Sequence, residues 1–185
     1  DYGVKRDDVL AHLAAVAPSV AIPVNADYEN GFASDPEGVA QNVTLAVATG
    51  IAGLSIEDST ANRNAPLYEM KLAVAGIAAA RAAIDATGKR VVLTGRAECY
   101  LVGRTDLKET IARLGAYAAA GADCLYAPGI RSREDITAVV RAVAPKPVNV
   151  LVFGEGMTVA ELAELGVRRI SVGGGLARTA WGGFV

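Results

Sequence analysis

The sequence predicts a single α/β domain over residues 1–185, arranged as a (β/α)8 barrel of the TIM type. Three observations support this prediction. The chain has 185 residues, 52% hydrophobic content, 20 glycines and a mean hydropathy of +0.31, as expected for one tightly packed core. A unit of helix, glycine and short apolar strand recurs along the chain. The strands are apolar runs without alternation, which favours a parallel sheet covered on both faces.

The recurring unit can be read directly in four stretches: "ATGIAGLSIED", "ATGKRVVLTGR", "AAGADCLYAPG" and "AELGVRRISVGG". In each stretch the first glycine (Gly50, Gly88, Gly121 and Gly166) follows a helical segment. Glycine is favoured there because a helix commonly ends on a residue with a left-handed backbone. We therefore predict a helix end at each of these four positions.

Six strands are expected, with amphipathic helices between them. The strand ranges are 21–26, 52–57, 90–96, 123–127, 147–152 and 169–173. The first strand is expected to bury Ile22, Val24 and Ala26. Helical periodicity is clearest in three segments, at 70–84, 107–118 and 136–143, where apolar residues recur every three or four positions.

The spacing of the strands, roughly 20 to 40 residues, suits either a barrel or a doubly wound sheet. A barrel with this spacing needs two more strands before Asp1 and a closing helix after Val185, so the chain would represent strands 3–8. The alternative is a Rossmann-like sheet. Because no strand runs into a GxGxxG turn, we favour the barrel.

Composition excludes several classes of partner. A formal charge of −2 and 5% aromatic residues give no basic or stacking surface for nucleic acid. Residues 38–56 are uncharged between Glu37 and Glu57, but their polar residues and Gly50 are not typical of a membrane span. Cys99 and Cys124 lie in unrelated contexts, which suits a reduced, cytoplasmic protein and not a zinc site.

Polar residues gather where the predicted strands end. In parallel α/β folds this edge of the sheet binds ligands. The residues at these ends are Asn25, Asp27, Tyr28, Glu29, Glu57, Asp58, Arg96 and Glu98, with Asn149 on the fifth strand. The opposite ends carry Lys89, Arg90, Lys146, Arg168 and Arg169, which we interpret as solvated turns.

The acids at this edge predict a metal site. Asp27, Glu29, Glu57 and Asp58 would repel one another, and raise one another's pKa, unless a cation lay among them. A hard divalent cation, Mg²⁺ held partly through water, suits such carboxylates. The alternative is an ordinary polar rim.

Residues that the chain lacks narrow the chemistry further. The single histidine, His12, lies on the first helix, and no lysine falls inside a strand or at its carboxyl end. A Ser-His-Asp triad and a Schiff-base lysine are therefore not expected. What remains is a metal that can stabilise an enolate, together with carboxylates and Arg96, which can bind a carboxylate with two hydrogen bonds.

These motifs resemble a known family. The segments "PVNADYENGF", "AGLSIED", "LTGRAECYL", "AGADCLYAPG", "PVNVL" and "ELGVRRISVGG", in this order, are similar to the isocitrate lyase / phosphoenolpyruvate mutase superfamily, especially its short bacterial mutase-like members. The resemblance implies a (β/α)8 barrel that binds Mg²⁺ and a small 2-oxo or 2-hydroxy carboxylic acid. It also implies a homotetramer in which the last helix is exchanged between subunits.

The resemblance also implies roles for individual residues. The metal ligands would be Asp27, Glu57 and, upstream, Asp1. The family's D-x-D motif reads Asn25-Ala26-Asp27 here, so one expected acid is an asparagine. Arg96 would bind the substrate carboxylate, with Asn149 and Asn25 as further substrate-binding residues. Glu98 follows Arg96 as in the family's R-x-E and is a candidate catalytic residue together with Arg96.

The reaction is less clear, because the loop at 59–70 departs from the family pattern. It reads "STANRNAPLYEM" and lacks the Lys-Lys-Cys-Gly-His sequence of isocitrate-type lyases; Arg63 and Asn64 are its candidate catalytic residues. Our leading hypothesis is a Mg²⁺-dependent lyase or decarboxylase that cleaves a C–C bond through a metal-stabilised enolate. The alternatives are a phosphonomutase or phosphonopyruvate hydrolase-like enzyme, a barrel that binds such acids without turnover, and a sugar-phosphate enzyme using "SVGGGLAR". Trp181, in the last helix, is expected in the core or in a subunit interface.

Overall fold

The computed structural model describes residues 3–60, 62–152 and 156–184, and in these ranges strands and helices alternate. The strands are β1 (Asn25–Asp27), β2 (Gly53–Glu57), β3 (Val92–Arg96), β4 (Cys124–Tyr126), β5 (Val148–Leu151) and β6 (Arg169–Ser171). The helices are α1 (Arg6–Val16), the short 3₁₀ helix η1 (Ala17–Ser19), α2 (Pro36–Ala48), α3 (Met70–Ala86), α4 (Leu107–Ala119), α5 (Arg133–Val143), α6 (Val159–Glu164) and α7 (Gly175–Gly182).

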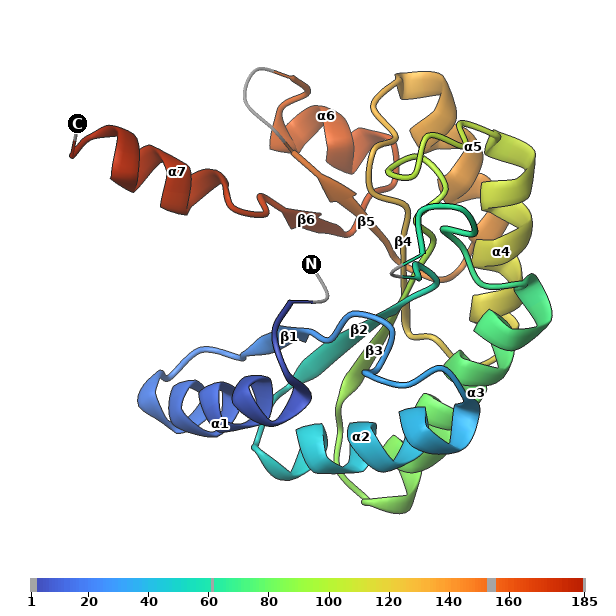
Figure 1. Cartoon of the computed structure of the whole chain (residues 1–185). Coiled ribbons are helices and arrows are strands. Elements are labelled where there is room, and N and C mark those ends of the chain that lie inside the picture. The colour runs from blue at the N-terminus through green and yellow to red at the C-terminus, as the bar shows by residue number, and fades with distance from the viewer. Residues whose placement is uncertain (1–2, 61, 153–155, 185) are drawn as a thin grey trace.

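The six strands form one parallel sheet in the order β1-β2-β3-β4-β5-β6. Each crossover therefore moves one strand further in the same direction, as in a barrel, whereas a doubly wound sheet reverses direction at a switch point. Figure 1 shows the sheet curled like part of a barrel wall, with α7 extending away from it. The two further strands and the closing helix that we expect remain predictions.

The strands lie where the sequence predicts them, but they are shorter. The first strand differs most: β1 begins at Asn25, and Ile22 is 73% exposed instead of buried. Backbone pairing with the next segment starts at Val24, whose carbonyl accepts from the amide of Ala52 at 2.8 Å. Gly53, the first residue of β2, pairs with Asn25. Ile22 comes before this paired segment and is therefore not covered by it.

The predicted helix ends are confirmed. Gly50, Gly88, Gly121 and Gly166 have φ angles of +91°, +67°, +105° and +91°. Gly121 has a second reason to be glycine, since a Cβ atom there would lie 2.5 Å from Cγ of Arg81. Packing and backbone conformation thus both require glycine at this turn.

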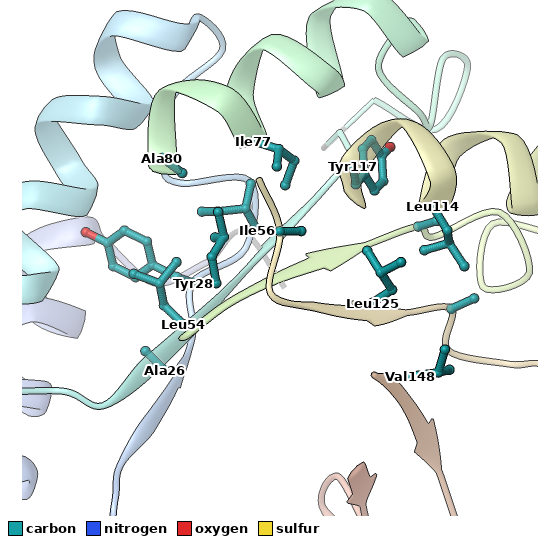
Figure 2. Packing of buried hydrophobic residues seen from close by; sticks show 14 of the residues in the cluster. Ala26, Tyr28, Leu54, Ile56, Ile77, Ala80, Leu114, Tyr117, Leu125 and Val148 are labelled. Atoms are coloured by element: carbon teal, nitrogen blue, oxygen red, sulfur yellow. The ribbon is translucent and has the colours of Figure 1, made fainter. Parts of the chain in front are cut away.

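The core lies between the outer face of the sheet and the helices. Leu54 and Ile56 of β2 point toward α3, where Ile77 is also buried (Figure 2). Leu125 of β4 packs in the same cluster as Leu114 of α4. Each such side chain contributes about 1.5–3 kcal/mol by leaving water.

The inner face of the sheet is polar, contrary to the expectation of uniformly apolar strands. Ser55, Thr94 and Asn149 are buried there, each next to an apolar residue that faces the helices. Arg169 also belongs to this face, although we predicted a solvated turn: it opens β6, and its Nη1 donates to Oγ1 of Thr94 at 3.5 Å. Side chains alternate along a strand, so only every second residue meets the helices. Arg168 is exposed, as predicted.

No helix in the described part of the chain is long and apolar enough to cross a membrane.

Candidate active site

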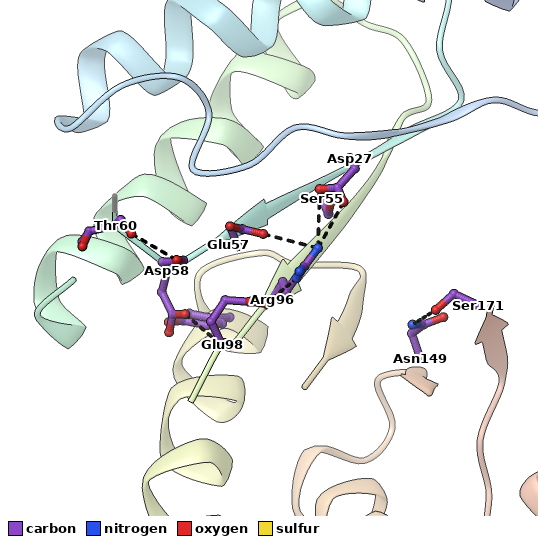
Figure 3. A network of polar contacts seen from close by, with 11 residues as sticks. Asp27, Ser55, Glu57, Asp58, Thr60, Arg96, Glu98, Asn149 and Ser171 are labelled. Atoms are coloured by element: carbon purple, nitrogen blue, oxygen red, sulfur yellow. Dashed lines mark hydrogen bonds and ion pairs between the residues drawn. The ribbon is translucent and has the colours of Figure 1, made fainter. Parts of the chain in front are cut away.

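The guanidinium of Arg96 lies among three carboxylates at the carboxyl edge of the sheet (Figure 3). Its Nη1 is 3.2 Å from Oδ2 of Asp27 and 3.3 Å from Oε2 of Glu57. Its Nε donates to Oε1 of Glu98. The cation that the clustered acids require is therefore supplied, at least in part, by the chain itself.

The sheet register explains this convergence. Glu57 and Arg96 are direct partners at the ends of β2 and β3. Asp27 ends β1 opposite Ser55, whose hydroxyl donates to Oδ1 of Asp27 at 3.4 Å. Because all the strands are parallel, residues that end them are brought to one edge.

Burial and charge shift the ionisation of the two central groups. Burial lowers the pKa of Arg96, but the hydrogen bond with Glu98 and the charges of Glu57 and Asp27 outweigh this and hold the pKa above its ordinary value. The pKa of Glu98 is raised, chiefly by burial, although its contact with Arg96 acts in the opposite direction. Arg96 therefore stays charged, while Glu98 holds its proton more tightly than an exposed glutamate.

An aromatic ring supports the arginine from the next strand. Cζ of Arg96 lies 5.4 Å from the ring centroid of Tyr126, within the range of a cation–π contact. Sequence reasoning missed this residue. The signal that could have found it is its position at the end of the strand in "ADCLY". Tyr126 is the register partner of Arg96, and it lies on the same inward face of β4 as Cys124, two residues earlier.

A cavity of about 520 Å³ opens over this cluster, a volume suited to a small molecule. Its polar lining comes from Asp27, Glu29, Glu57, Ser59, Arg96 and Glu98. Glu29, predicted to support the cluster, has a left-handed backbone with φ of +47°. Such a conformation is uncommon in a residue with a side chain, and strained residues of this kind cluster at functional sites.

Two of the three predicted metal ligands reach this cavity. The Asp27 side chain is 70% exposed and Glu57 is 10% exposed, whereas Asp1 lies outside the described residues. Among the residues described, no group of three or more His, Cys, Asp or Glu side chains is arranged to ligate a metal directly. Two carboxylates facing an open cavity fit Mg²⁺, which keeps several waters and uses few protein ligands.

Asp58 does not lie at the mouth, where we expected it. It is 2% exposed, and Oδ2 accepts from Nη1 of Arg113 at 3.1 Å and from the hydroxyl of Tyr117 at 2.5 Å, both on α4. Glu57 and Asp58 are adjacent, so strand alternation sends them to opposite sides of the sheet. Sequence reasoning missed Arg113 and Tyr117, which read as ordinary residues of an amphipathic helix.

The two predicted substrate-binding asparagines are not among the residues that line the cavity. Asn25 lies two residues before Asp27, is exposed, and donates to the carbonyl of Ala26 at 3.3 Å. Asn149 is fully buried and donates to Oγ of Ser171 at 2.9 Å. It is the register partner of Tyr126, one strand further from Arg96.

The two candidate catalytic residues of the loop are not brought to the cavity lining. Arg63 and Asn64 are exposed and do not line the cavity. The amide of Asn64 donates to Oδ1 of Asn62 at 2.9 Å, so the loop makes a local turn here. In this conformation the loop reaches the cavity through Ser59 instead.

The last helix is unlike the others. Trp181 is 73% exposed, and its ring centroid lies 6.4 Å from that of Phe184. Of the two placements that we expected, in the core or in a subunit interface, the core is therefore wrong. The placement of Trp181 in a subunit interface remains a prediction.

A curled parallel sheet with charged residues and a cavity at its carboxyl edge defines the class: an α/β protein of the barrel type. A family model described as phosphoenolpyruvate phosphomutase matches residues 1–185. The chain belongs to this family, within the isocitrate lyase / phosphoenolpyruvate mutase superfamily.

Solved structures and a curated relative agree with this assignment. A protein of Burkholderia cenocepacia described as a lyase/mutase is 48% identical, with a TM-score of 0.94 over 98% of this chain and 66% of that one. A 2,3-dimethylmalate lyase is 27% identical, with a TM-score of 0.89 over 98% of this chain and 65% of the lyase. An oxaloacetate decarboxylase of Bradyrhizobium sp. is 30% identical over 83% of this chain and 52% of the decarboxylase. The chain thus spans between about half and two thirds of the length of these proteins.

Proposed function

We propose that this chain forms the ligand-binding edge of a Mg²⁺-dependent lyase or decarboxylase that acts on a small 2-oxo or 2-hydroxy carboxylic acid. The observation that carries the proposal is the placement of Arg96, which faces a cavity while three carboxylates hold it. The relatives described as an oxaloacetate decarboxylase and a 2,3-dimethylmalate lyase support the same substrate class.

Arg96 would bind the substrate carboxylate. Its planar guanidinium suits a carboxylate bound by two parallel hydrogen bonds. Glu98 at Nε and the ring of Tyr126 restrict how the group can turn. A substrate carboxylate would compete with Asp27, the most exposed of the three partners, for Nη1.

Asp27 and Glu57 would hold the metal, with water and substrate oxygens completing its coordination. Mg²⁺ bound there would supply Lewis-acid polarisation of the substrate's carbonyl oxygen. Ser55 keeps Asp27 oriented through its hydroxyl group. Asn25, in place of a further acid, leaves one negative charge fewer on β1, two residues before Asp27.

Glu98 is the candidate proton carrier. Burial raises the pKa of this carboxyl, so it can hold a proton nearer to neutral pH than an exposed glutamate. It lines the cavity beside Arg96, within reach of a ligand bound to the guanidinium.

A phosphonate enzyme is the second candidate, because the matching family model is described as phosphoenolpyruvate phosphomutase. Arg96 is the one cationic side chain among the described residues that line the cavity. A dianionic phosphonate would require more positive charge in the cavity lining. A carboxylic acid substrate is therefore favoured over a phosphonate. A barrel that binds acids without turnover remains the third candidate.

One substrate panel separates these candidates. The full-length protein that carries this chain would be incubated with Mg²⁺ and oxaloacetate, methylisocitrate or phosphonopyruvate, and formation of pyruvate or phosphoenolpyruvate would be followed. Pyruvate release from oxaloacetate or methylisocitrate supports the proposal. Conversion of phosphonopyruvate alone, either to pyruvate by hydrolysis or to phosphoenolpyruvate by phosphoryl transfer, supports the second candidate. Binding of these acids without formation of any product supports the third.

The expected homotetramer is also a proposal. Leu176, Trp181 and Phe184 near the C-terminal end are exposed, and burying them against another subunit would remove apolar surface from water. Sedimentation of the full-length protein, compared with a Trp181→Ser variant, would test this contact.

A further inference from the structure

Asp58 is a buried carboxylate that joins three separate parts of the chain. Its Oδ2 accepts from Arg113 and Tyr117 of α4, and its Oδ1 accepts from the backbone amide of Glu98 at 2.8 Å. Asp58, Arg113, Tyr117 and Glu98 are each at most 4% exposed. A carboxylate with this many donors is held in one orientation.

Arg113 contacts a second residue in addition to Asp58. The same Nη1 donates to the carbonyl of Tyr68 at 3.0 Å, and the amide of Tyr68 donates to the carbonyl of Asp58 at 2.9 Å. Asp58 and Tyr68 stand at the two ends of the segment that joins β2 to α3. We call the described part of this segment, residues 59–60 and 62–67, the β2–α3 loop. The guanidinium of Arg113 thus contacts the residues at both ends of the loop.

The loop and Glu98 both border the cavity. Ser59, at the start of the loop, lines it, as does Glu98. The loop is also tied to the segment after β1, because Nδ2 of Asn30 donates to the hydroxyl of Tyr68 at 2.9 Å. Asp58, Arg113 and Tyr117 do not line the cavity, so any effect on a ligand must pass through these neighbours.

Stability alone is a weak reason for this arrangement. A buried ion pair loses much of its Coulomb attraction to the cost of leaving water, and well-packed apolar residues are often as stable. Such a pair does fix geometry, because each hydrogen bond has a required direction. The feature it fixes here is the position of Glu98 relative to the loop.

We propose that Arg113 and Asp58 are positioning residues, which hold Glu98 and the β2–α3 loop in one arrangement around the ligand bound to Arg96. This inference rests on the proposed function for its catalytic consequence. Its structural part, the coupling of the loop to Glu98, stands on the contacts alone.

The chain contains a matched control at the other end of β3. Nη1 of Arg81 contacts Oδ2 of Asp123 at 3.0 Å, and the same oxygen accepts from the amide of Leu93 at 2.8 Å. This arrangement likewise joins an arginine, an aspartate and a backbone amide, but its Arg81 and Asp123 side chains are more exposed, at 21% and 43%, and do not line the cavity. Arg81→Lys therefore controls for the general cost of exchanging such an arginine.

The test uses the full-length protein carrying Arg113→Lys, with Tyr117→Phe as a milder second variant. Nε and Nη2 of Arg113 also contact Oε1 of Glu109, at 3.1 and 3.0 Å. A lysine keeps the charge, but its single ammonium group cannot contact Asp58, Tyr68 and Glu109 together. Hydrogen exchange should become about tenfold faster at the amides of Glu98 and Tyr68 in Arg113→Lys. In Tyr117→Phe it should rise at Glu98 alone, because Tyr117 contacts Asp58 and not the loop. Arg81→Lys should leave both amides unchanged.

Kinetics with the substrate found in the panel provide the second measurement. Arg113→Lys should lower kcat by about tenfold or more, while KM changes less than about threefold because Arg96 is untouched. Unchanged exchange at Glu98 and Tyr68 would overturn the inference, as would equal losses of kcat in Arg113→Lys and Arg81→Lys. Faster local exchange in a protein inactive on every compound would contradict the proposed function and leave the coupling intact.

Discussion

The guanidinium of Arg96 lies 3.2 Å from the carboxylate of Asp27, although strand β2 separates the strands that carry them. The contact is possible because the sheet curls and both residues point inward. The sequence predicted a metal cation among these acids, because carboxylates repel one another. The structure shows that the arginine side chain already supplies a positive charge there. Three carboxylates face this one guanidinium, so the cluster still carries negative charge that can attract Mg²⁺.

Replacing Arg96 should separate carboxylate binding from metal binding. Arg96→Ala removes a charged pair of hydrogen bonds, so the affinity for oxalate should fall by about tenfold or more. Mg²⁺ affinity should stay equal or rise, because a positive charge beside Asp27 and Glu57 is lost. Titration calorimetry measures both quantities. Arg90→Ala, an exposed arginine in the turn before β3, is the control, and equal oxalate affinity in the two variants would refute the assigned role.

Replacing Asn25 by aspartate should strengthen metal binding. Asn25 and Asp27 lie on the same face of β1, so Asn25→Asp adds a carboxylate two residues before Asp27. A charge within ~7 Å of a divalent ion in a water-like dielectric is worth on the order of 1 kcal/mol, which predicts a severalfold gain in Mg²⁺ affinity. Gln41→Glu, on the exposed face of α2, supplies an equal charge elsewhere. A gain of the same size in both variants would show that only net charge matters.

The raised pKa of Glu98 predicts a pH dependence of stability. Burial raises its pKa above the ordinary value of 4.5, so the folded state binds the proton more tightly than the unfolded state. Its contribution to stability is therefore fully present below pH 4.5 and is lost as the pH rises through the folded-state pKa. Between pH ~4 and ~7, the free energy of unfolding of the native chain should fall relative to that of Glu98→Gln. Urea denaturation across this range measures the difference. A difference that grows in favour of the native chain would mean that Arg96 outweighs burial.

Most of the fold could be predicted from the sequence because its signals are local. Gly50 and Gly121 mark helix ends through their own backbone preferences, and both predictions are confirmed. The convergence of Asp27, Glu57 and Arg96 was also predictable, because parallel strands end at one edge. Neither inference requires knowledge of side-chain direction.

The errors arise where side-chain direction matters. Asp58 and Glu57 are neighbours in sequence, yet one is buried against α4 and the other faces the cavity, and composition does not reveal the phase of a short strand. Arg169 reads as a turn residue because charges are rare in the barrel interior, but the polar inner face accepts it beside Thr94. The partners of Asp58 come from a helix about 55 residues later in the chain, a separation that no local pattern reports.

The most direct test of the account is whether Glu57 is required for binding of Mg²⁺ together with a carboxylic acid. The melting temperature of the full-length protein would be measured with and without Mg²⁺ and oxalate, and the same comparison made for Glu57→Ala and for the exposed control Glu164→Ala. A ligand that binds the folded state raises the melting temperature. The melting temperature should rise clearly in the native protein and in Glu164→Ala, and should not rise in Glu57→Ala. An undiminished rise in Glu57→Ala would contradict the metal site and the function built on it.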